Sequence, residues 1–358
     1  MTSLFDPLAL GPYSLSNRVF LAPMTRGRAT ADAVPTPRMA KYYAQRASGG
    51  LLISEGVQVS PQGVGWQCAP GIWTDEMVEA WKPVPEAVHA AGGRIFMQLW
   101  HLGRVSHPDF QNGAAPVGPS AIAAAGESHT PGGKKSYVTP RALKADELPG
   151  IVQDFVRGAK NAIAAGFDGI ELHAANGYLL DQFIRDGANK RDDDYGGSIE
   201  NRWRFPLEVA AAVAAAIGAE RTGIRVSPTG RYNDMGDADP VGSYTYGAQQ
   251  LSKLGVVYLH AVEPVPGHMM HNPDGPAVLP ALREHFSGIV VTNGGFEAES
   301  AAAVLKEGLA DAVAFGMPFL ANPDLVQRLK TGAEQNAPDF ATFYSDTDKG
   351  YADYPALA

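Results

Sequence analysis

Short aliphatic runs alternate with alanine-rich, helix-like segments along most of this chain. Eight runs are apolar on both faces of a predicted strand, at 19–22, 51–54, 94–99, 169–173, 222–226, 257–261, 289–292 and 312–315. Helical patterns cover 37–47, 75–91, 145–165, 205–217, 244–254, 298–307 and 322–329. Apolar strands that alternate with helices indicate a parallel sheet covered by helices. Eight such units predict an α/β protein with a single (β/α)8 TIM barrel, as one domain over 1–358.

The alternative is an open, doubly wound sheet. Against it, no G-x-G-x-x-G follows the first strand, where the chain reads Pro23-Met-Thr-Arg26.

Two regions interrupt the alternation of strands and helices. Residues 3–18 predict a hairpin around Gly11 that caps the N-terminal mouth of the barrel. Residues 103–144, rich in Gly, Pro and Ser, predict a long lid loop without a helix after the third strand.

Composition narrows the class of protein. The 358 residues are 45% hydrophobic and 19% charged, with a formal net charge of -9, which favours a globular protein and disfavours nucleic-acid binding. The lone Cys68 can form neither an internal disulfide nor a cysteine-type zinc site. Residues 1–10 resemble no signal peptide, and the longest apolar helical stretch is too short for a membrane span. We therefore expect a cytoplasmic protein with no membrane or nucleic-acid partner.

In a (β/α)8 barrel the active site lies at the carboxyl ends of the strands. Those positions hold neutral hydrogen-bonding groups, one arginine, glycines and aromatic residues, and few carboxylates. No G-x-S-x-G or H-E-x-x-H motif is present, which disfavours a hydrolase or a metal-dependent lyase. The pair His268-Met-Met-His271 has metal-like spacing but no clear third ligand, so we predict no metal. The set suits a flat, phosphorylated cofactor.

Several motifs, in order along the chain, resemble the Old Yellow Enzyme family, which includes N-ethylmaleimide and glycerol trinitrate reductases. They are APMTR at 22–26, QLWHLGR at 98–104, ELHAANGYLLDQF at 171–183, RDDDYGGSIENR at 191–202, AVAFG at 312–316, NPDLV at 322–326 and GYADYP at 350–355. The resemblance runs from about residue 3 to the C-terminus. Each motif alone is weak, but the ordered set is highly specific.

The resemblance implies three catalytic residues. His173 and Asn176 would donate hydrogen bonds to the carbonyl or nitro oxygen of the substrate, where charge develops during hydride addition. Tyr178 would protonate the neighbouring carbon as a general acid. Many relatives carry a second histidine where this chain has Asn176, and an amide cannot become cationic.

The resemblance also implies an FMN site. Thr25 would bind the flavin C4 carbonyl, while Gln98 and Arg225 would face its pyrimidine side. The other residues expected around FMN and its phosphate are Pro23, Met24, Gly56, Asn293, Gly294, Gly295, Phe315, Gly316 and Met317. Most relatives have a basic residue in place of Met317, so we expect a weaker hold on the phosphate here.

The implied activity is an NAD(P)H-dependent, ping-pong FMN ene-reductase that acts on enones, enals, maleimides or nitroalkenes. Trp66, Trp100 and Tyr344 would shape the substrate pocket, and Trp66 stands where relatives usually have tyrosine. A nitrate-ester or nitro-compound reductase remains the alternative within the family. A non-catalytic flavin sensor is disfavoured by the intact catalytic trio. The expected reductant is NADPH or NADH, which the sequence does not rank, and the chain is expected to be a monomer or homodimer.

Overall fold

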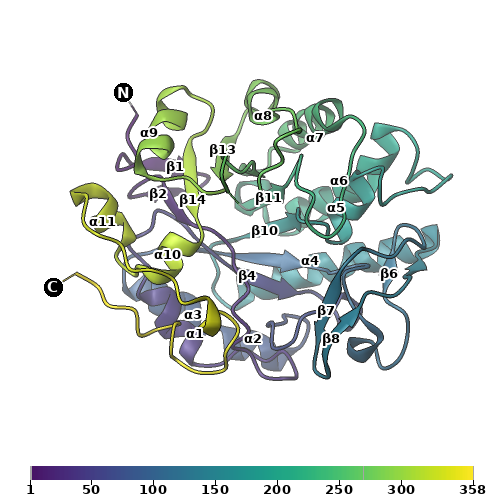
Figure 1. Cartoon of the computed structure of the whole chain (residues 1–358), viewed down its shortest axis with the longest axis horizontal. Helices are drawn as coiled ribbons and strands as arrows, with labels where there is room; N and C mark the ends of the chain where they lie inside the picture. The colour runs from purple at the N-terminus through teal and green to yellow at the C-terminus, as the bar shows by residue number, and fades with distance from the viewer. Residues whose placement is uncertain (1, 269, 358) are drawn as a thin grey trace.

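The structure is a computed structural model that describes residues 2–268 and 270–357. Eight parallel strands form a closed barrel in the order β10-β11-β12-β13-β14-β3-β4-β5, with helices around it (Figure 1). The strands are β3 (Val19–Leu21), β4 (Leu52–Gln58), β5 (Ile95–Trp100), β10 (Gly169–Ala174), β11 (Thr222–Val226), β12 (Tyr258–Val262), β13 (Ile289–Asn293) and β14 (Ala312–Phe315). The eight apolar runs therefore are the barrel strands, and the predicted TIM barrel is confirmed.

The helices follow the predicted pattern with several corrections. They are α1 (Arg38–Ala44), α2 (Asp75–Trp81), α3 (Pro83–Ala90), α4 (Leu148–Ala164), α5 (Leu179–Ile184), α6 (Ile199–Ile217), α7 (Pro240–Leu254), α8 (Leu279–His285), α9 (Ala298–Lys306), α10 (Met317–Ala321) and α11 (Leu325–Thr331). The single helix predicted over 75–91 is wrong, because Pro83 begins a second helix. Helix α6 begins earlier than predicted, where the Ser198 side chain accepts the amide of Asn201. Helices α5, α8 and α10 were not predicted.

A hairpin of β1 (Leu8–Leu10) and β2 (Tyr13–Leu15) covers the N-terminal end of the barrel. Gly11 makes its turn with φ +51°, and a Cβ there would lie 2.3 Å from the carbonyl oxygen of Glu220. The Tyr13 hydroxyl donates to the carbonyl oxygen of Asp168 just before β10. The predicted hairpin cap is thus confirmed, and it closes the end of the barrel opposite the predicted site.

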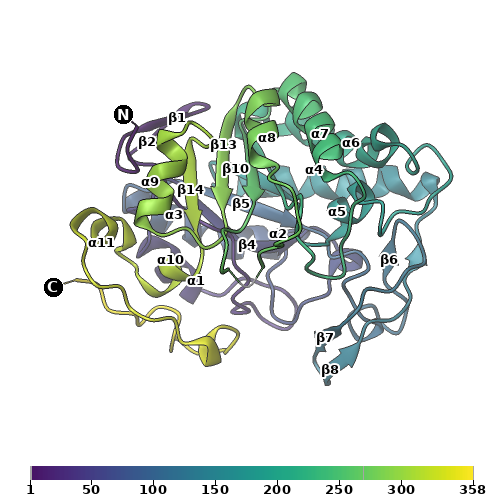
Figure 2. The ribbon, with the colours of Figure 1, turned by 45° about the horizontal axis from the view of Figure 1, so that its top comes forward.

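The long segment after β5 contains an antiparallel hairpin of β7 (Glu127–Thr130) and β8 (Gly133–Ser136), which the sequence pattern did not predict. In Figure 2 this hairpin lies far from β1 and β2, at the end of the barrel where the C-terminal segment also lies. Between residues 103 and 144, all of which the structure describes, a 3-10 turn over Pro108–Phe110 is the only helical piece. None of the helices in the described ranges is long and apolar enough to cross a membrane.

Candidate active site

A cavity of about 630 Å³ opens at the carboxyl ends of the barrel strands. Every residue that the sequence predicted for catalysis, for FMN or for the substrate pocket lines this cavity. These residues come from the ends of different strands and from loops far apart in the sequence. Their convergence depends on closure of the barrel, which brings all eight carboxyl ends to one face.

His173, Tyr178 and Trp100 form an aromatic group on one side of the cavity. The rings of His173 and Tyr178 lie 4.8 Å apart between centroids at an interplanar angle of 73°. Trp100 at the end of β5 stacks on His173 at 6.1 Å and meets Tyr178 edge-on at 4.8 Å. All three side chains are buried. Trp100 therefore holds the imidazole and the phenol in fixed relative positions.

Burial keeps the rings of His173 and Tyr178 uncharged. It lowers the pKa of His173 well below its ordinary value, and the positive charge of Arg225 adds to the effect. Burial likewise raises the pKa of Tyr178 well above 10. At neutral pH His173 is thus a neutral imidazole with one N–H, and Tyr178 keeps its proton.

A two-residue left-handed turn joins His173 to Tyr178. Asn176 and Gly177 have φ values of +59° and +79°. Four side chains bind all four backbone polar groups of this turn. Ser227 Oγ accepts the Asn176 amide at 2.7 Å, and Asn233 Nδ2 donates to the Asn176 carbonyl at 2.8 Å. The Gly177 amide donates to Asp181 Oδ2 at 2.8 Å, and Gln182 Nε2 donates to the Gly177 carbonyl at 2.7 Å.

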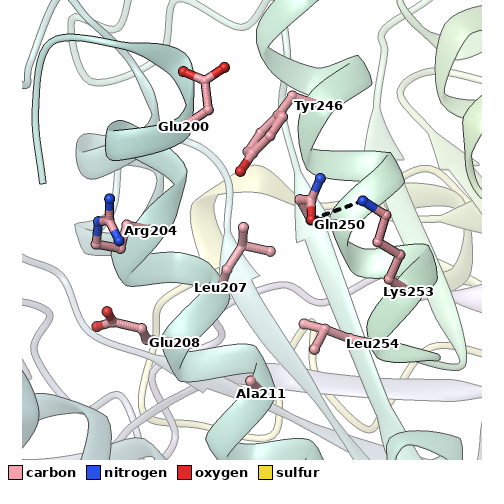
Figure 3. Close-up of a pocket in the computed structure, with 9 residues that line it drawn as sticks. All are labelled: Glu200, Arg204, Leu207, Glu208, Ala211, Tyr246, Gln250, Lys253 and Leu254. Carbon is pink, nitrogen blue, oxygen red and sulfur yellow. Dashed lines mark hydrogen bonds between the residues drawn. The ribbon is translucent and has the colours of Figure 1, made fainter. Parts of the chain in front are cut away.

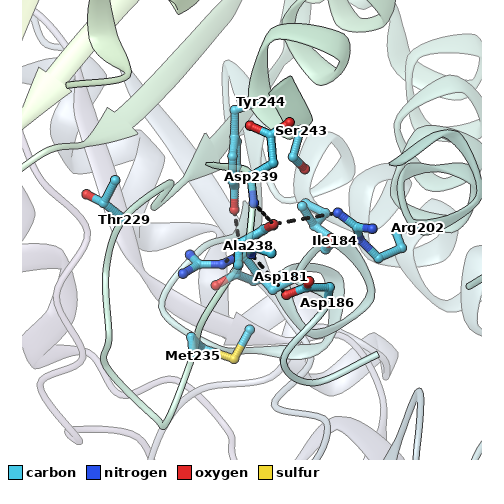
Figure 4. A network of polar contacts seen from close by, with 12 residues as sticks. Asp181, Ile184, Asp186, Arg202, Thr229, Met235, Ala238, Asp239, Ser243 and Tyr244 are labelled. Carbon is cyan, nitrogen blue, oxygen red and sulfur yellow. Dashed lines mark hydrogen bonds and ion pairs between the residues drawn. The ribbon is translucent and has the colours of Figure 1, made fainter. Parts of the chain in front are cut away.

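Behind this turn lies a buried polar network (Figure 4). Asp181 also accepts the hydroxyl of Tyr244 at 2.9 Å and that of Ser227 at 3.4 Å. Arg185 donates to the carbonyl oxygen of Ser227 at 2.8 Å. Asp237 lies between Arg185 and Arg202, at 4.0 and 3.6 Å. Because these groups are buried and paired, the network restricts movement of the turn that carries Asn176.

Gln98, Arg225 and Asn293 form the polar floor of the cavity. Arg225 is buried on β11 and donates to Asn293 Oδ1 at 3.2 Å. Within the described residues, Arg225 Nε and His173 Nδ1 are buried and have no hydrogen-bond partner. Buried polar atoms are nearly always paired, so these atoms fit a ligand with a polar edge. The residues present therefore fit a flavin ring over this floor.

Glycines line the side of the cavity formed by β13 and β14. Gly294 and Gly295 have φ values of +133° and +82°, which side chains rarely adopt. No hydrogen bond to another described residue occupies the backbone amides of Gly295, Gly316 or Met317. Free backbone amides along the wall of a cavity suit a phosphate group. The Met317 side chain also lines the cavity and brings no charge.

The mouth of the cavity is aromatic. Trp66 lies 5.3 Å from Tyr344 and 5.6 Å from His129 of the β7–β8 hairpin, between ring centroids. Tyr344 is 57% exposed, and its segment is held by Arg26 and Arg28, which both donate to the carbonyl oxygen of Phe343. The β7–β8 hairpin, which lies in the segment predicted as a lid loop, and the C-terminal segment thus meet at Trp66.

Sequence reasoning missed several residues that line the cavity, among them Tyr232, His268, Met270 and Phe296. Tyr232 lies on the loop after β11, where nothing in the local pattern marks it. The sequence pattern around His268 suggests only metal-like spacing, and Met269 beside it lies outside the described residues. No cluster of three or more potential metal ligands occurs in the described part of the chain.

A second cavity lies on the outer surface between α6 and α7 (Figure 3). Its walls are Leu207, Ala211, Tyr246 and Leu254, with charged residues such as Arg204 at its edge. The groups at the strand ends do not contribute to it. The cavity at the carboxyl ends is therefore the candidate active site.

Comparisons with known proteins agree with this geometry. The model of the NADH:flavin oxidoreductase / NADH oxidase family matches residues 3–336. The chain is 47% identical to 12-oxophytodienoate reductase 1 of Oryza sativa subsp. japonica, over 99% of this chain and 93% of that protein. It is 44% identical to 12-oxophytodienoate reductase 2 of Arabidopsis thaliana, over 99% and 96%.

Solved structures give the same result. The Old Yellow Enzyme homologue from Zymomonas mobilis superposes with a TM-score of 0.97 at 47% identity, over 99% of this chain and all of that chain. Morphinone reductase in complex with tetrahydroNAD superposes with a TM-score of 0.94 at 48% identity, over 100% and 98%. The family match, the barrel and the cavity lead to one conclusion: this chain is an FMN-dependent oxidoreductase that belongs to the NADH:flavin oxidoreductase / NADH oxidase family, within the Old Yellow Enzymes.

Proposed function

We propose that this protein is an ene-reductase that uses reduced nicotinamide to saturate the C=C bond of enones, enals, maleimides or nitroalkenes. The chemistry that bound FMN supplies is hydride transfer at N5, first from the nicotinamide and then to the β-carbon of the alkene. The observation that carries the proposal is the neutral imidazole of His173, which lies 4.8 Å from the protonated phenol of Tyr178 between ring centroids, with Asn176 lining the same cavity.

His173 and Asn176 bind the carbonyl or nitro oxygen of the alkene. Negative charge grows on that oxygen as hydride arrives at the β-carbon, so donors fixed beforehand lower the barrier. Removal of one such donor typically costs about 10²–10³ in kcat. The buried network behind Asn176 supports this role, because it holds the turn before substrate arrives.

Tyr178 donates a proton to the α-carbon. Its raised pKa keeps the proton on the phenol until an enolate, a strong base, develops beside it. We infer that Pro23, Met24, Thr25, Gly56, Gln98 and Arg225 hold the flavin ring. The phosphate would lie near Asn293, Gly294, Gly295, Phe315, Gly316 and Met317, and Trp66, Trp100 and Tyr344 would shape the substrate side.

Anaerobic spectroscopy tests this function. FMN-loaded protein should bleach on addition of NADPH or NADH, and the comparison of both rates decides the preferred reductant. Addition of 2-cyclohexenone should then restore the oxidised spectrum. Tyr178→Phe should bleach normally and recover slowly, whereas bleaching without recovery in the wild type would refute an ene-reductase. A nitrate ester as the second oxidant tests the alternative, since the same two donors can bind a nitro oxygen.

A further inference from the structure

A buried carboxylate–imidazole pair lies beside the polar floor of the cavity, and the proposed reaction does not use it. Glu171 on β10 and His260 on β12 have fully buried side chains, and Glu171 Oε2 lies 2.9 Å from His260 Nδ1. The other carboxylate oxygen, Oε1, accepts Gln98 Nε2 at 2.8 Å. One carboxylate therefore connects a floor residue to a buried histidine.

Strand register fixes where this pair lies. Glu171 is opposite Gln98 of β5, and His260 is opposite Arg225 of β11. Glu171 and His173 are two residues apart on β10, so both side chains point to the interior of the barrel. The pair is thus next to both floor residues that we assign to the pyrimidine side of the flavin.

The titratable groups that surround Glu171 are His260, Arg225, Tyr258 and His173. Burial lowers the pKa of His260 and raises the pKa of Tyr258 well above 10, so both are neutral. His173 is neutral for the same reason. Burial lowers the pKa of Arg225, and the charge of Glu171 opposes that effect. Arg225 and Glu171 are therefore the two formal charges of this floor, of opposite sign.

We propose that Glu171 is a positioning residue that sets the reduction potential of bound FMN, by orienting Gln98 and by offsetting the charge of Arg225. The proposal rests on the assignment of Gln98 and Arg225 to the flavin in the proposed function. It assigns a role to a residue that does not line the cavity itself.

The orientation of Gln98 follows from hydrogen-bond chemistry. A carboxylate only accepts hydrogen bonds, so the NH₂ group of Gln98 must face Glu171. The amide oxygen of Gln98 is then left for a donor on the cofactor edge. Reduction adds negative charge to the flavin, which a nearby cation favours and a nearby carboxylate opposes. Arg225 alone would therefore make bound FMN easier to reduce than Arg225 paired with Glu171.

Glu171→Gln removes this charge and preserves the contacts. The new amide oxygen can accept Gln98 Nε2, and the new NH₂ can donate to His260 Nδ1 once the histidine proton moves to Nε2. His260 Nε2 has no partner within the described residues, so either tautomer is compatible with the site. We expect at least a tenfold change in the reduction equilibrium in favour of reduced FMN, which is about +30 mV for a two-electron couple.

The experiment measures the midpoint potential of FMN-loaded wild type and variants by anaerobic equilibration with a reference dye. His260→Gln is the matched control, because it alters the same buried pair and leaves the carboxylate in place; its potential should not rise. FMN content and Tm are recorded in parallel. An unchanged potential in Glu171→Gln, or an equal rise in His260→Gln, would overturn the proposal.

If Glu171→Gln does not retain FMN, Glu171→Asp decides, since it keeps the charge on a shorter side chain. The proposal requires Glu171→Asp to load FMN and to have a reduction equilibrium within tenfold of that of the wild type. Loss of FMN in Glu171→Asp as well would make Glu171 a folding residue. Recovery of the oxidised spectrum with 2-cyclohexenone is scored separately in the wild type, so failure of the proposed function remains distinguishable.

Discussion

Ser227 provides the sharpest test of the turn that carries Asn176. Its hydroxyl accepts the Asn176 amide at 2.7 Å and donates to Asp181 at 3.4 Å. Ser227→Ala removes both hydrogen bonds and leaves the carboxylate of Asp181 and the side chain of Asn176 in place. The substitution therefore perturbs only the position of the turn, without touching substrate or cofactor.

The expected decrease in rate follows from the hydrogen bond that is lost. A backbone N–H left without an acceptor in this part-buried position costs about 1–2 kcal/mol. If the turn shifts to relieve that cost, Asn176 and Tyr178 move with it, and even a small displacement lowers the rate. The same free energy corresponds to about a 5- to 30-fold decrease in the rate of alkene reduction.

The assay is stopped-flow measurement of reoxidation by 2-cyclohexenone after stoichiometric reduction. Ser243→Ala is the matched control, because Ser243 is an equally buried hydroxyl that accepts Trp203 Nε1 at 3.1 Å. It belongs to the same region (Figure 4) and makes no bond to the turn. Ser227→Ala should slow reoxidation and Ser243→Ala should not. Equal rates in the two variants would refute the argument that side chains hold the turn for catalysis.

Three further predictions concern the cofactor, the substrate and pH. Met317→Arg should lower the Kd for FMN about tenfold or more by adding a charge beside the phosphate, and equal constants would contradict this. Trp66→Tyr should change the enantiomeric ratio of a prochiral enone product, measured by chiral chromatography, because Trp66 packs at the mouth. Burial raises the pKa of Glu55 from 4.5 to about 7, so the stability linked to its neutral form is present below about pH 4.5 and lost as pH rises through 7. Glu55→Gln should therefore gain up to about 3 kcal/mol over wild type at pH 8 and little at pH 5, by thermal unfolding.

The barrel was predictable because its signal is local and repeated. Each strand is an apolar run of its own, and the rule that sites form at carboxyl ends then selects His173, Gln98 and Arg225 without further information. Helices α5 and α10 were missed because they have six and five residues, too few for a helical period to be visible. The split at Pro83 could have been read from the proline itself, which favours the first turn of a helix.

The side chains that hold the turn of Asn176 and Gly177 were not predictable from local patterns. Ser227 and Asn233 from the loop after β11, and Asp181 from the short helix α5, converge on one turn. Each looks like an ordinary polar residue in sequence. Asn233 itself lies in the left-handed region at φ +56°, which the neighbouring Arg104 stabilises by donating to its carbonyl oxygen at 3.2 Å. Such contacts depend on the spacing between β10 and β11, which exists only after the barrel has closed.

The floor and the mouth of the cavity differ in how far substitutions can change them. Gln98 and Arg225 lie on strands whose register is fixed by backbone hydrogen bonds on both sides, so the floor cannot shift without disturbing the barrel. Trp66, Tyr232 and Tyr344 lie on separate loops, and Tyr232 and Tyr344 are 49% and 57% exposed. If the proposed function holds, substitutions at the mouth should alter which alkene fits and leave the polar floor intact. Differences in substrate preference among proteins with this barrel should map to these loops, whereas differences in reduction potential should map to the buried pair beside the floor.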